Sequence, residues 1–198
     1  MTKGNWRYAR FYCEENIWFL GQETVFAKFL KKVVFISNHP RRCVLFHQRG
    51  ANSPELPITF DYHVILICDD GGWQAWDLDS SLSLPTPLKE YLDMTFGKQT
   101  PNPGELMPYF RIIDFEEFRS KFSSDRSHMR DSNGKWIAPP PAWPAIVMGE
   151  SSNLADLIDM RRRSFGSVMN LRDFRTEYGH GGGSVNRDAD PGRQHFTD

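Results

Sequence analysis

The fold follows from residues 62–78, which read YHVILICDDGGWQAWDL. Residues 62–68 are apolar on both faces, which predicts a strand in the interior of a sheet. The Asp-Asp-Gly-Gly run at 69–72 is a strong hairpin signal, because these residues tolerate the backbone angles of tight turns. Residues 73–78 are therefore expected to return antiparallel to the first strand.

Further elements surround this hairpin. β-rich runs predict three more strands, at 33–36, 43–46 and 109–113. Helical patterns predict four helices, with starts near Glu14, Pro87, Asp114 and Asn153. The first is expected to continue through Phe26 to Leu30, with an interruption or bend at Gly21. The mixture predicts an α+β fold with a mostly antiparallel sheet flanked by helices.

Length and composition limit the class of protein. The 198 residues predict one domain over 1–178, followed by a tail at 179–198 that lacks apolar periodicity and is expected to be disordered. The 24 basic and 25 acidic residues nearly cancel, which argues against nucleic acid or a membrane surface as partner. No apolar run is long enough for a membrane span, and the first residues lack a signal-peptide core.

The cysteines indicate the compartment and offer a nucleophile. Cys13, Cys43 and Cys68 are an odd number with no C-x-x-C pair, which favours reduced thiols in the cytoplasm or also the nucleus and disfavours a zinc site. Cys13 lies at a predicted helix start, where the helix dipole favours a reactive thiolate. The negative charges of Glu14 and Glu15 oppose that effect. An inert structural thiol is the alternative for Cys13, and it fits Cys43 and Cys68 well.

A histidine and two carboxylates occur along the hairpin. Asp77 and Asp79 share one face of their strand, because side chains alternate. A loop centred on Asp70 places His63 opposite Asp77, and one centred on Gly71 places it opposite Asp79. A two-residue turn would put His63 on the other face, so pairing requires an odd loop or a bulge.

His128, in the polar run at 124–129, is a rival candidate for a catalytic base. It follows a predicted helix, so its positive form could instead complement the helix dipole.

Phe-Asp-Tyr-His-Val at 60–64 resembles the Trp-Asp-Tyr-His-Val motif of protein N-terminal glutamine amidohydrolases. The likeness spans about residues 11–175 and includes the blocks 12–18, 34–38, 77–79, 122–129 and 136–141. It implies a monomer with a transglutaminase- or papain-like cysteine hydrolase arrangement and a triad of Cys13, His63 and Asp77, not Asp79. The implied reaction converts an N-terminal glutamine of a protein to glutamate with release of ammonia. It would feed the arginylation branch of the N-degron pathway and needs no metal or organic cofactor.

The match departs from the family pattern at two places. Phe60 replaces the motif's tryptophan, which keeps an aromatic wall beside the substrate but removes an indole N–H donor. Residues 164–167 read Ser-Phe-Gly-Ser where the family has a Gly-Trp-Gly region.

Selection of chain ends requires an acceptor for the substrate's α-ammonium group. The acidic candidates are Glu14, Glu15, Asp61 and Asp125. Asp61 is favoured among them because it is close to His63 in the chain.

Two other classes of protein remain open. The first is a different thiol hydrolase or transferase, namely a protease or a transglutaminase. The second is a non-catalytic module that binds N-termini, with Cys13 as an inert thiol.

Overall fold

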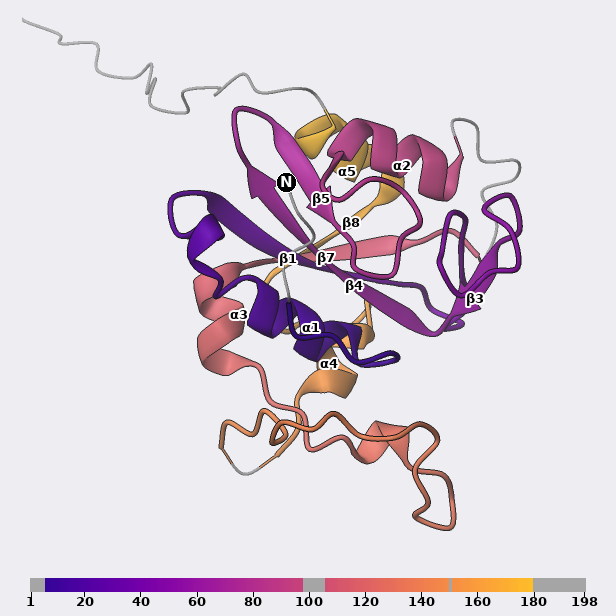
Figure 1. The fold of residues 1–198 in the computed structure, drawn as a ribbon, viewed down its shortest axis with the longest axis vertical. Coiled ribbons are helices and arrows are strands. Elements are labelled where there is room, and N and C mark those ends of the chain that lie inside the picture. The colour runs from indigo at the N-terminus through magenta and orange to yellow at the C-terminus, as the bar shows by residue number, and fades with distance from the viewer. Residues whose placement is uncertain (1–5, 98–105, 150, 180–198) are drawn as a thin grey trace, which may run out of the picture.

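The computed structural model describes residues 6–97, 106–149 and 151–179. Its centre is a six-stranded sheet in the order β6-β5-β4-β1-β7-β8, in which each neighbouring pair is antiparallel (Figure 1). The strands are β1 (Leu30–Ser37), β4 (Tyr62–Asp69), β5 (Trp73–Trp76), β6 (Thr86–Pro87), β7 (Tyr109–Asp114) and β8 (Ser167–Asn170). A separate two-stranded sheet pairs β2 (Cys43–Leu45) with β3 (Ile58–Phe60). The predicted α+β class is confirmed.

Helices cover both faces of the large sheet. One face contacts α1 (Cys13–Leu20), α3 (Phe115–Lys121) and α4 (Leu154–Ile158), and the other contacts α2 (Leu88–Phe96) and α5 (Leu171–Tyr178). Two short 3-10 turns are η1 (Thr24–Phe26) and η2 (Ser127–Met129). None of these helices is long and apolar enough to cross a membrane.

The central strands supply both halves of the core. Along β4, Val64 and Leu66 belong to the core on the α1 side, whereas Ile65 and Ile67 belong to the core on the α2 side. Residues on β1 alternate in the same way, so both strands are buried on two faces. The continuous apolar run in β4 therefore predicted its central place in the sheet.

The hairpin has the odd loop that a His63–carboxylate pairing requires. Asp69 pairs with Trp73, which leaves a three-residue loop centred on Gly71. Gly71 has φ +72°, a conformation that glycine adopts without steric cost. The predicted strand at 73–78 was too long, since β5 ends at Trp76.

The prediction for the first helix was wrong beyond Gly21. The helix ends at Leu20, residues 24–26 form η1, and Leu30 already belongs to β1. A Cβ atom on Gly21 would lie 2.0 Å from the ring of Phe115, so α3 packs where only glycine fits. Apolar spacing alone could not distinguish the end of the helix from the turn and strand that follow it.

Other elements also differ from the predictions. Asp114 occupies the N-cap position of α3 but caps nothing with its side chain. Its carboxylate instead accepts a hydrogen bond from Lys32, its cross-strand partner on β1, at 2.5 Å. Thr86–Pro87 joins the sheet rather than the helix that follows, and neither β8 nor α5 was predicted. The predicted tail at 180–198 lies outside the described residues.

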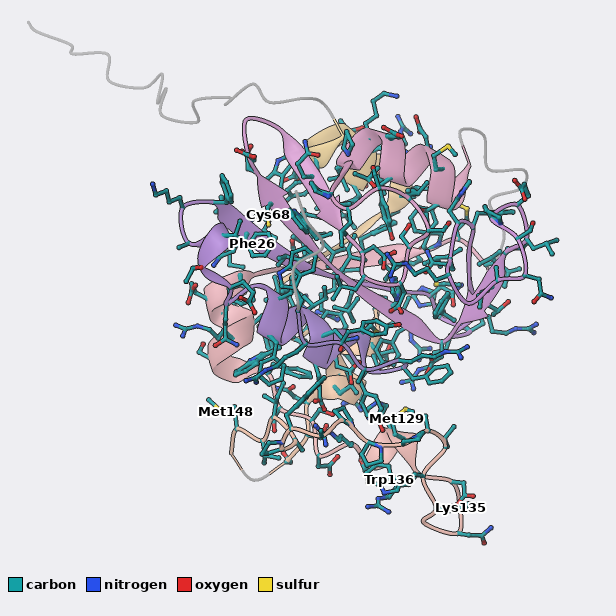
Figure 2. All side chains as sticks on the ribbon, in the orientation of Figure 1. Phe26, Cys68, Met129, Lys135, Trp136 and Met148 are labelled. Carbon is teal, nitrogen blue, oxygen red and sulfur yellow. The ribbon has the colours of Figure 1, made fainter. Side chains whose placement is uncertain are left out.

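Residues 122–149 leave the sheet after α3 and form an irregular segment below it (Figure 1). Met129, Trp136 and Lys135 mark this segment in Figure 2, well away from Phe26 and Cys68 in the main body. Its start returns to the N-terminal end of α1, where Arg126 hydrogen-bonds Glu15. The segment therefore contributes side chains to the neighbourhood of Cys13.

Candidate active site

Cys13 is the first residue of α1, and the residue is 9% exposed. The helix packs on β4, and the backbone N–H of Val64 lies within hydrogen-bonding reach of the sulfur and favours the thiolate. The thiol donates to Glu14 Oε2 at 3.7 Å. Burial first, and then the charge of Glu14, raise the pKa of Cys13 well above its usual value. The helix start does not by itself produce a thiolate, so the thiol requires a base.

His63 precedes Val64 in β4, and its ring is hydrogen-bonded to Asp77. His63 Nε2 is 2.9 Å from Asp77 Oδ1, and because a carboxylate only accepts, Nε2 carries the hydrogen. The other ring nitrogen, Nδ1, is buried and has no hydrogen-bond partner among the described residues. This nitrogen is therefore available to exchange a proton with a group in the site.

The carboxylate of Asp77 is held by four donors. Oδ1 also accepts from the backbone N–H of Asp79 at 2.9 Å, and Oδ2 accepts from Tyr91 at 2.9 Å and Gln48 at 3.4 Å. Burial favours the protonated acid, but the positive charge and hydrogen bond of His63 outweigh it and lower the pKa of Asp77. For His63, burial has the opposite effect and lowers the pKa, but the charge and hydrogen bond of Asp77 outweigh it, so the net pKa is raised.

The hairpin explains why Asp77 rather than Asp79 contacts His63. A loop centred on Gly71 would place Asp79 directly opposite His63 if the ladder continued. The ladder stops at Trp76, and the chain turns so that Asp79 contributes its backbone N–H to Asp77. The carboxylate of Asp79 instead accepts from the hydroxyl of Tyr8.

A second polar group lies next to Cys13 and consists of Glu14, Tyr62 and His128. Glu14 is fully buried, and its Oε2 accepts from the hydroxyl of Tyr62 at 3.0 Å. His128 Nε2 lies 3.3 Å from that hydroxyl and 3.6 Å from Glu14 Oε1. His128 therefore lies with Glu14, while the histidine that is hydrogen-bonded to Asp77 is His63. Tyr62 was not predicted from the sequence as a site residue. Alternation along β4 puts its side chain on the opposite face of the strand from that of His63.

The remaining acidic candidates are already engaged or exposed. Glu15 is buried in a two-bond ion pair with Arg126, at 2.7 Å each, and also accepts from Trp143 Nε1. Asp61 and Asp125 are exposed, and each accepts a nearby backbone N–H, from Tyr62 and Ser127 respectively.

Phe60 forms one wall of the site. Its ring centroid lies 5.1 Å from that of His63, with the planes tilted by 40°. The aromatic ring thus packs beside the imidazole, and its place beside the substrate stays a prediction.

His63, Asp77 and Asp79 could each offer one ligand atom to a metal ion, with these atoms within 4.8 Å of one another. The oxygens of Asp77 already accept four N–H or O–H donors, which suits a hydrogen-bonded carboxylate better than a metal ligand. The absence of a metal requirement stays a prediction.

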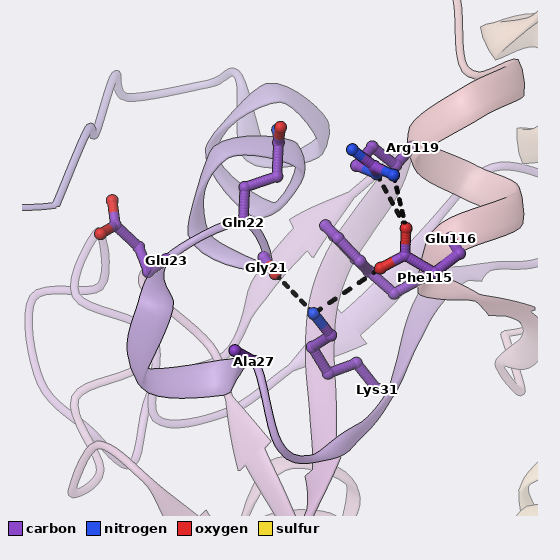
Figure 3. A pocket seen from close by; sticks show the side chains of 8 residues that line it. All are labelled: Gly21, Gln22, Glu23, Ala27, Lys31, Phe115, Glu116 and Arg119. Atoms are coloured by element: carbon purple, nitrogen blue, oxygen red, sulfur yellow. Dashed lines mark hydrogen bonds and ion pairs between the residues drawn. The ribbon is translucent and has the colours of Figure 1, made fainter.

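A surface hollow of about 330 Å³ lies at the opposite end of α1 (Figure 3). Lys31 crosses it, donating to the carbonyl of Gly21 and pairing with Glu116. Its lining contains none of the predicted site residues, so the hollow does not explain the chemistry proposed for Cys13.

Comparison with known proteins agrees with the motif. The sequence model of the family described as N-terminal glutamine amidase matches residues 8–178. The chain is 35% identical to the protein N-terminal glutamine amidohydrolase of Bos taurus, with 84% of each chain covered. It is 34% identical to the protein of that name from Homo sapiens, with 87% of each covered, and 36% identical to that from Danio rerio, with 87% of this chain and 89% of the relative covered. The chain therefore belongs to the N-terminal glutamine amidase family.

Proposed function

We propose that this protein hydrolyses the side-chain amide of an N-terminal glutamine in proteins or peptides, giving glutamate and ammonia. The family and its named relatives support the reaction and the substrate class. The hydrogen bond between His63 Nε2 and Asp77, which leaves Nδ1 without a partner, is the single structural observation that carries the mechanism.

In the first step, Cys13 acts as the nucleophile and His63 as the base. The thiol proton passes to His63 Nδ1 while the sulfur attacks the carboxamide carbon. Because the pKa of Cys13 is raised, this proton transfer accompanies the attack rather than preceding it. Asp77 holds the ring and stabilises the imidazolium that forms. The backbone N–H of Cys13, at the start of α1, is the candidate donor to the developing oxyanion.

In the second step, His63 returns the proton to the leaving nitrogen, the carbon–nitrogen bond breaks and ammonia departs. A thioester between Cys13 and the substrate remains. His63 then takes a proton from water, hydroxide attacks the thioester carbon, and the proton returns to the departing sulfur. The products are glutamate at the chain end and the restored thiol, without a metal or organic cofactor.

We propose that residues 1–178 act as one catalytic domain and that the protein works as a monomer in the cytoplasm or also the nucleus. The same proposal places its product in the arginylation branch of the N-degron pathway. The domain limits follow from length and apolar periodicity, the compartment from the cysteines, and the monomer and the pathway from the sequence resemblance.

Mass spectrometry of two short peptides tests the reaction. One peptide begins with glutamine and the other carries glutamine internally. We expect a gain of about one dalton only in the first, because amide nitrogen is replaced by oxygen, together with release of ammonia. A cut backbone would indicate a protease, and incorporation of an added amine a transglutaminase. No change with folded protein would contradict the proposal and favour a binding module.

A further inference from the structure

We propose that Glu14 receives the α-ammonium group of the substrate and so restricts the reaction to the ends of chains. This inference rests on the proposed function and assigns a specificity residue to it.

The first argument is position. Glu14 follows Cys13 in the chain, and its Oε2 lies 3.7 Å from the sulfur. The amine and the carboxamide of glutamine belong to one small residue. An acceptor for the amine must therefore lie close to the nucleophile that attacks the carboxamide, and Glu14 meets this requirement.

The second argument is unused bonding capacity. Glu14 Oε2 accepts from Tyr62, but Oε1 is buried and accepts no hydrogen bond from any residue that the structure describes. A buried carboxylate oxygen without a donor is costly, and an ammonium group would supply both the donor and the compensating charge.

The third argument is the state of the other carboxylates. Both oxygens of Glu15 are taken by Arg126. Asp61 and Asp125 are exposed, where solvent and salt weaken an ion pair. Glu14 therefore replaces Asp61 as the favoured acceptor.

A partly exposed side chain lies next to this buried acceptor. His128 Nε2 lies 3.6 Å from Glu14 Oε1, and the side chain of His128 is 25% exposed whereas that of Glu14 is fully buried. Burial lowers the pKa of His128, which favours the neutral ring and leaves Glu14 without a permanent cation. An incoming ammonium group does not compete with a fixed positive charge at this position.

Binding of the amine would assist the chemistry as well. Burial raises the pKa of Glu14 to about 7, and after burial the charge of Glu14 is the largest cause of the raised pKa of Cys13. An ammonium group beside Glu14 neutralises that charge and makes proton loss from Cys13 easier. An internal glutamine brings no cation and leaves the thiol hard to ionise.

Paired substrates and variants test this role. The first peptide begins with glutamine, and the second begins with a glutaramoyl group, which keeps the carboxamide but has hydrogen in place of the α-amine. Ammonia release gives kcat/KM for each peptide with wild type, Glu14→Gln, Glu14→Asp and Asp61→Asn. Glu90→Gln, on the exposed side of α2, is the matched control. Circular dichroism and urea unfolding check that each variant is folded.

For wild type and Glu90→Gln we expect the glutamine peptide to be preferred by on the order of 10²-fold or more. Glu14→Gln should lower kcat/KM only for the glutamine peptide, because the neutral amide no longer attracts the amine. The preference for that peptide should then shrink to within about threefold. Glu14→Asp, which keeps the charge, should retain part of the preference.

Other results would overturn the proposal. An equal loss for both peptides would make Glu14 a support for Cys13, and a lost preference in Asp61→Asn alone would return the role to Asp61. If Glu14→Gln does not fold, a preference unchanged in Glu14→Asp, with its shortened reach, counts against Glu14. Absence of ammonia release from the glutamine peptide in wild type would overturn the proposed function itself.

Discussion

Two polar groups, one around His63 and Asp77 and one around Glu14 beside Cys13, differ in how completely their carboxylates are hydrogen-bonded. On one side, the carboxylate of Asp77 accepts four hydrogen bonds and carries a lowered pKa. On the other, Glu14 has one oxygen without a donor among the described residues and a pKa raised to about 7. The first arrangement suits a fixed charge that orients His63, whereas the second suits a group that awaits a ligand.

The two sides also come from different parts of the chain. His63 and Asp77 come from one hairpin, from β4 and the residues just after β5, and Gln48 and Tyr91 add hydrogen bonds to Asp77 from outside it. The Glu14 side includes His128 from η2, which lies in the segment at 122–149, more than a hundred residues along the chain from α1. Local chain geometry thus fixes the orienting group, and long-range packing fixes the group that we assign to substrate selection.

The largest expected effect comes from replacing Cys13, the proposed nucleophile. Cys13→Ser should lower kcat by at least about 10⁴-fold, because a hydroxyl is a far weaker nucleophile in the same position. Ammonia release from a glutamine peptide measures this loss. Cys43→Ser and Cys68→Ser, at buried core positions, are the matched controls and should retain turnover wherever they fold. Turnover retained in Cys13→Ser would contradict the role of Cys13 as nucleophile, and with it the roles assigned to His63, Asp77 and Glu14.

The next effect separates the two aspartates on the His63 side. Asp77→Asn should lower kcat by about 10²- to 10⁴-fold, since an amide neither fixes the tautomer of His63 nor stabilises its charge. Asp79→Asn should cost less than about tenfold, because Asp79 supports Asp77 through its backbone N–H, which the variant keeps. Steady-state kinetics on one peptide compares the two. Equal losses would mean that both carboxylates serve the reaction.

Much of the His63 side could be predicted from the sequence. Apolar residues on both faces of 62–68 identified a central strand, and alternation limited which residues could meet His63. The choice between loop lengths could not be made, because Asp-Asp-Gly-Gly suits turns of two or three residues. The choice of Asp77 came from the family resemblance. In the structure it depends on the end of the ladder at Trp76, which no local pattern marks.

The Glu14 side could not be predicted in this way. Glu14 and Glu15 resemble the exposed acids that often begin a helix, yet both are fully buried. Their burial depends on Arg126 and His128, which arrive through tertiary packing. The overlong first helix has a related cause, since the packing of α3 against Gly21 is invisible to helical periodicity.

The dependence of stability on pH distinguishes the two sides. Because the folded pKa of Glu14 is raised from 4.5 to about 7, the folded protein binds more protons than the unfolded chain between these values. The free energy of unfolding should therefore fall by roughly 3 kcal/mol from this group as pH rises through that window. Urea unfolding should show that Glu14→Gln removes this decline and Glu90→Gln does not. Asp77 acts in the opposite direction, since its lowered pKa gives stability that is lost only as pH falls below its unfolded value of about 4.

The smallest expected effect concerns the wall beside His63. Phe60→Trp introduces an indole N–H while keeping an aromatic ring near the imidazole, so it should change kcat/KM by less than about tenfold, the value of one neutral hydrogen bond. Phe60→Ala should act differently, because water would reach His63 and weaken the burial that lowers its pKa. Its pKa would then rise further, and the acidic limb of the kcat/KM profile should move to higher pH. A shift of that limb in Phe60→Trp as large as in Phe60→Ala would show that the ring does more than exclude water.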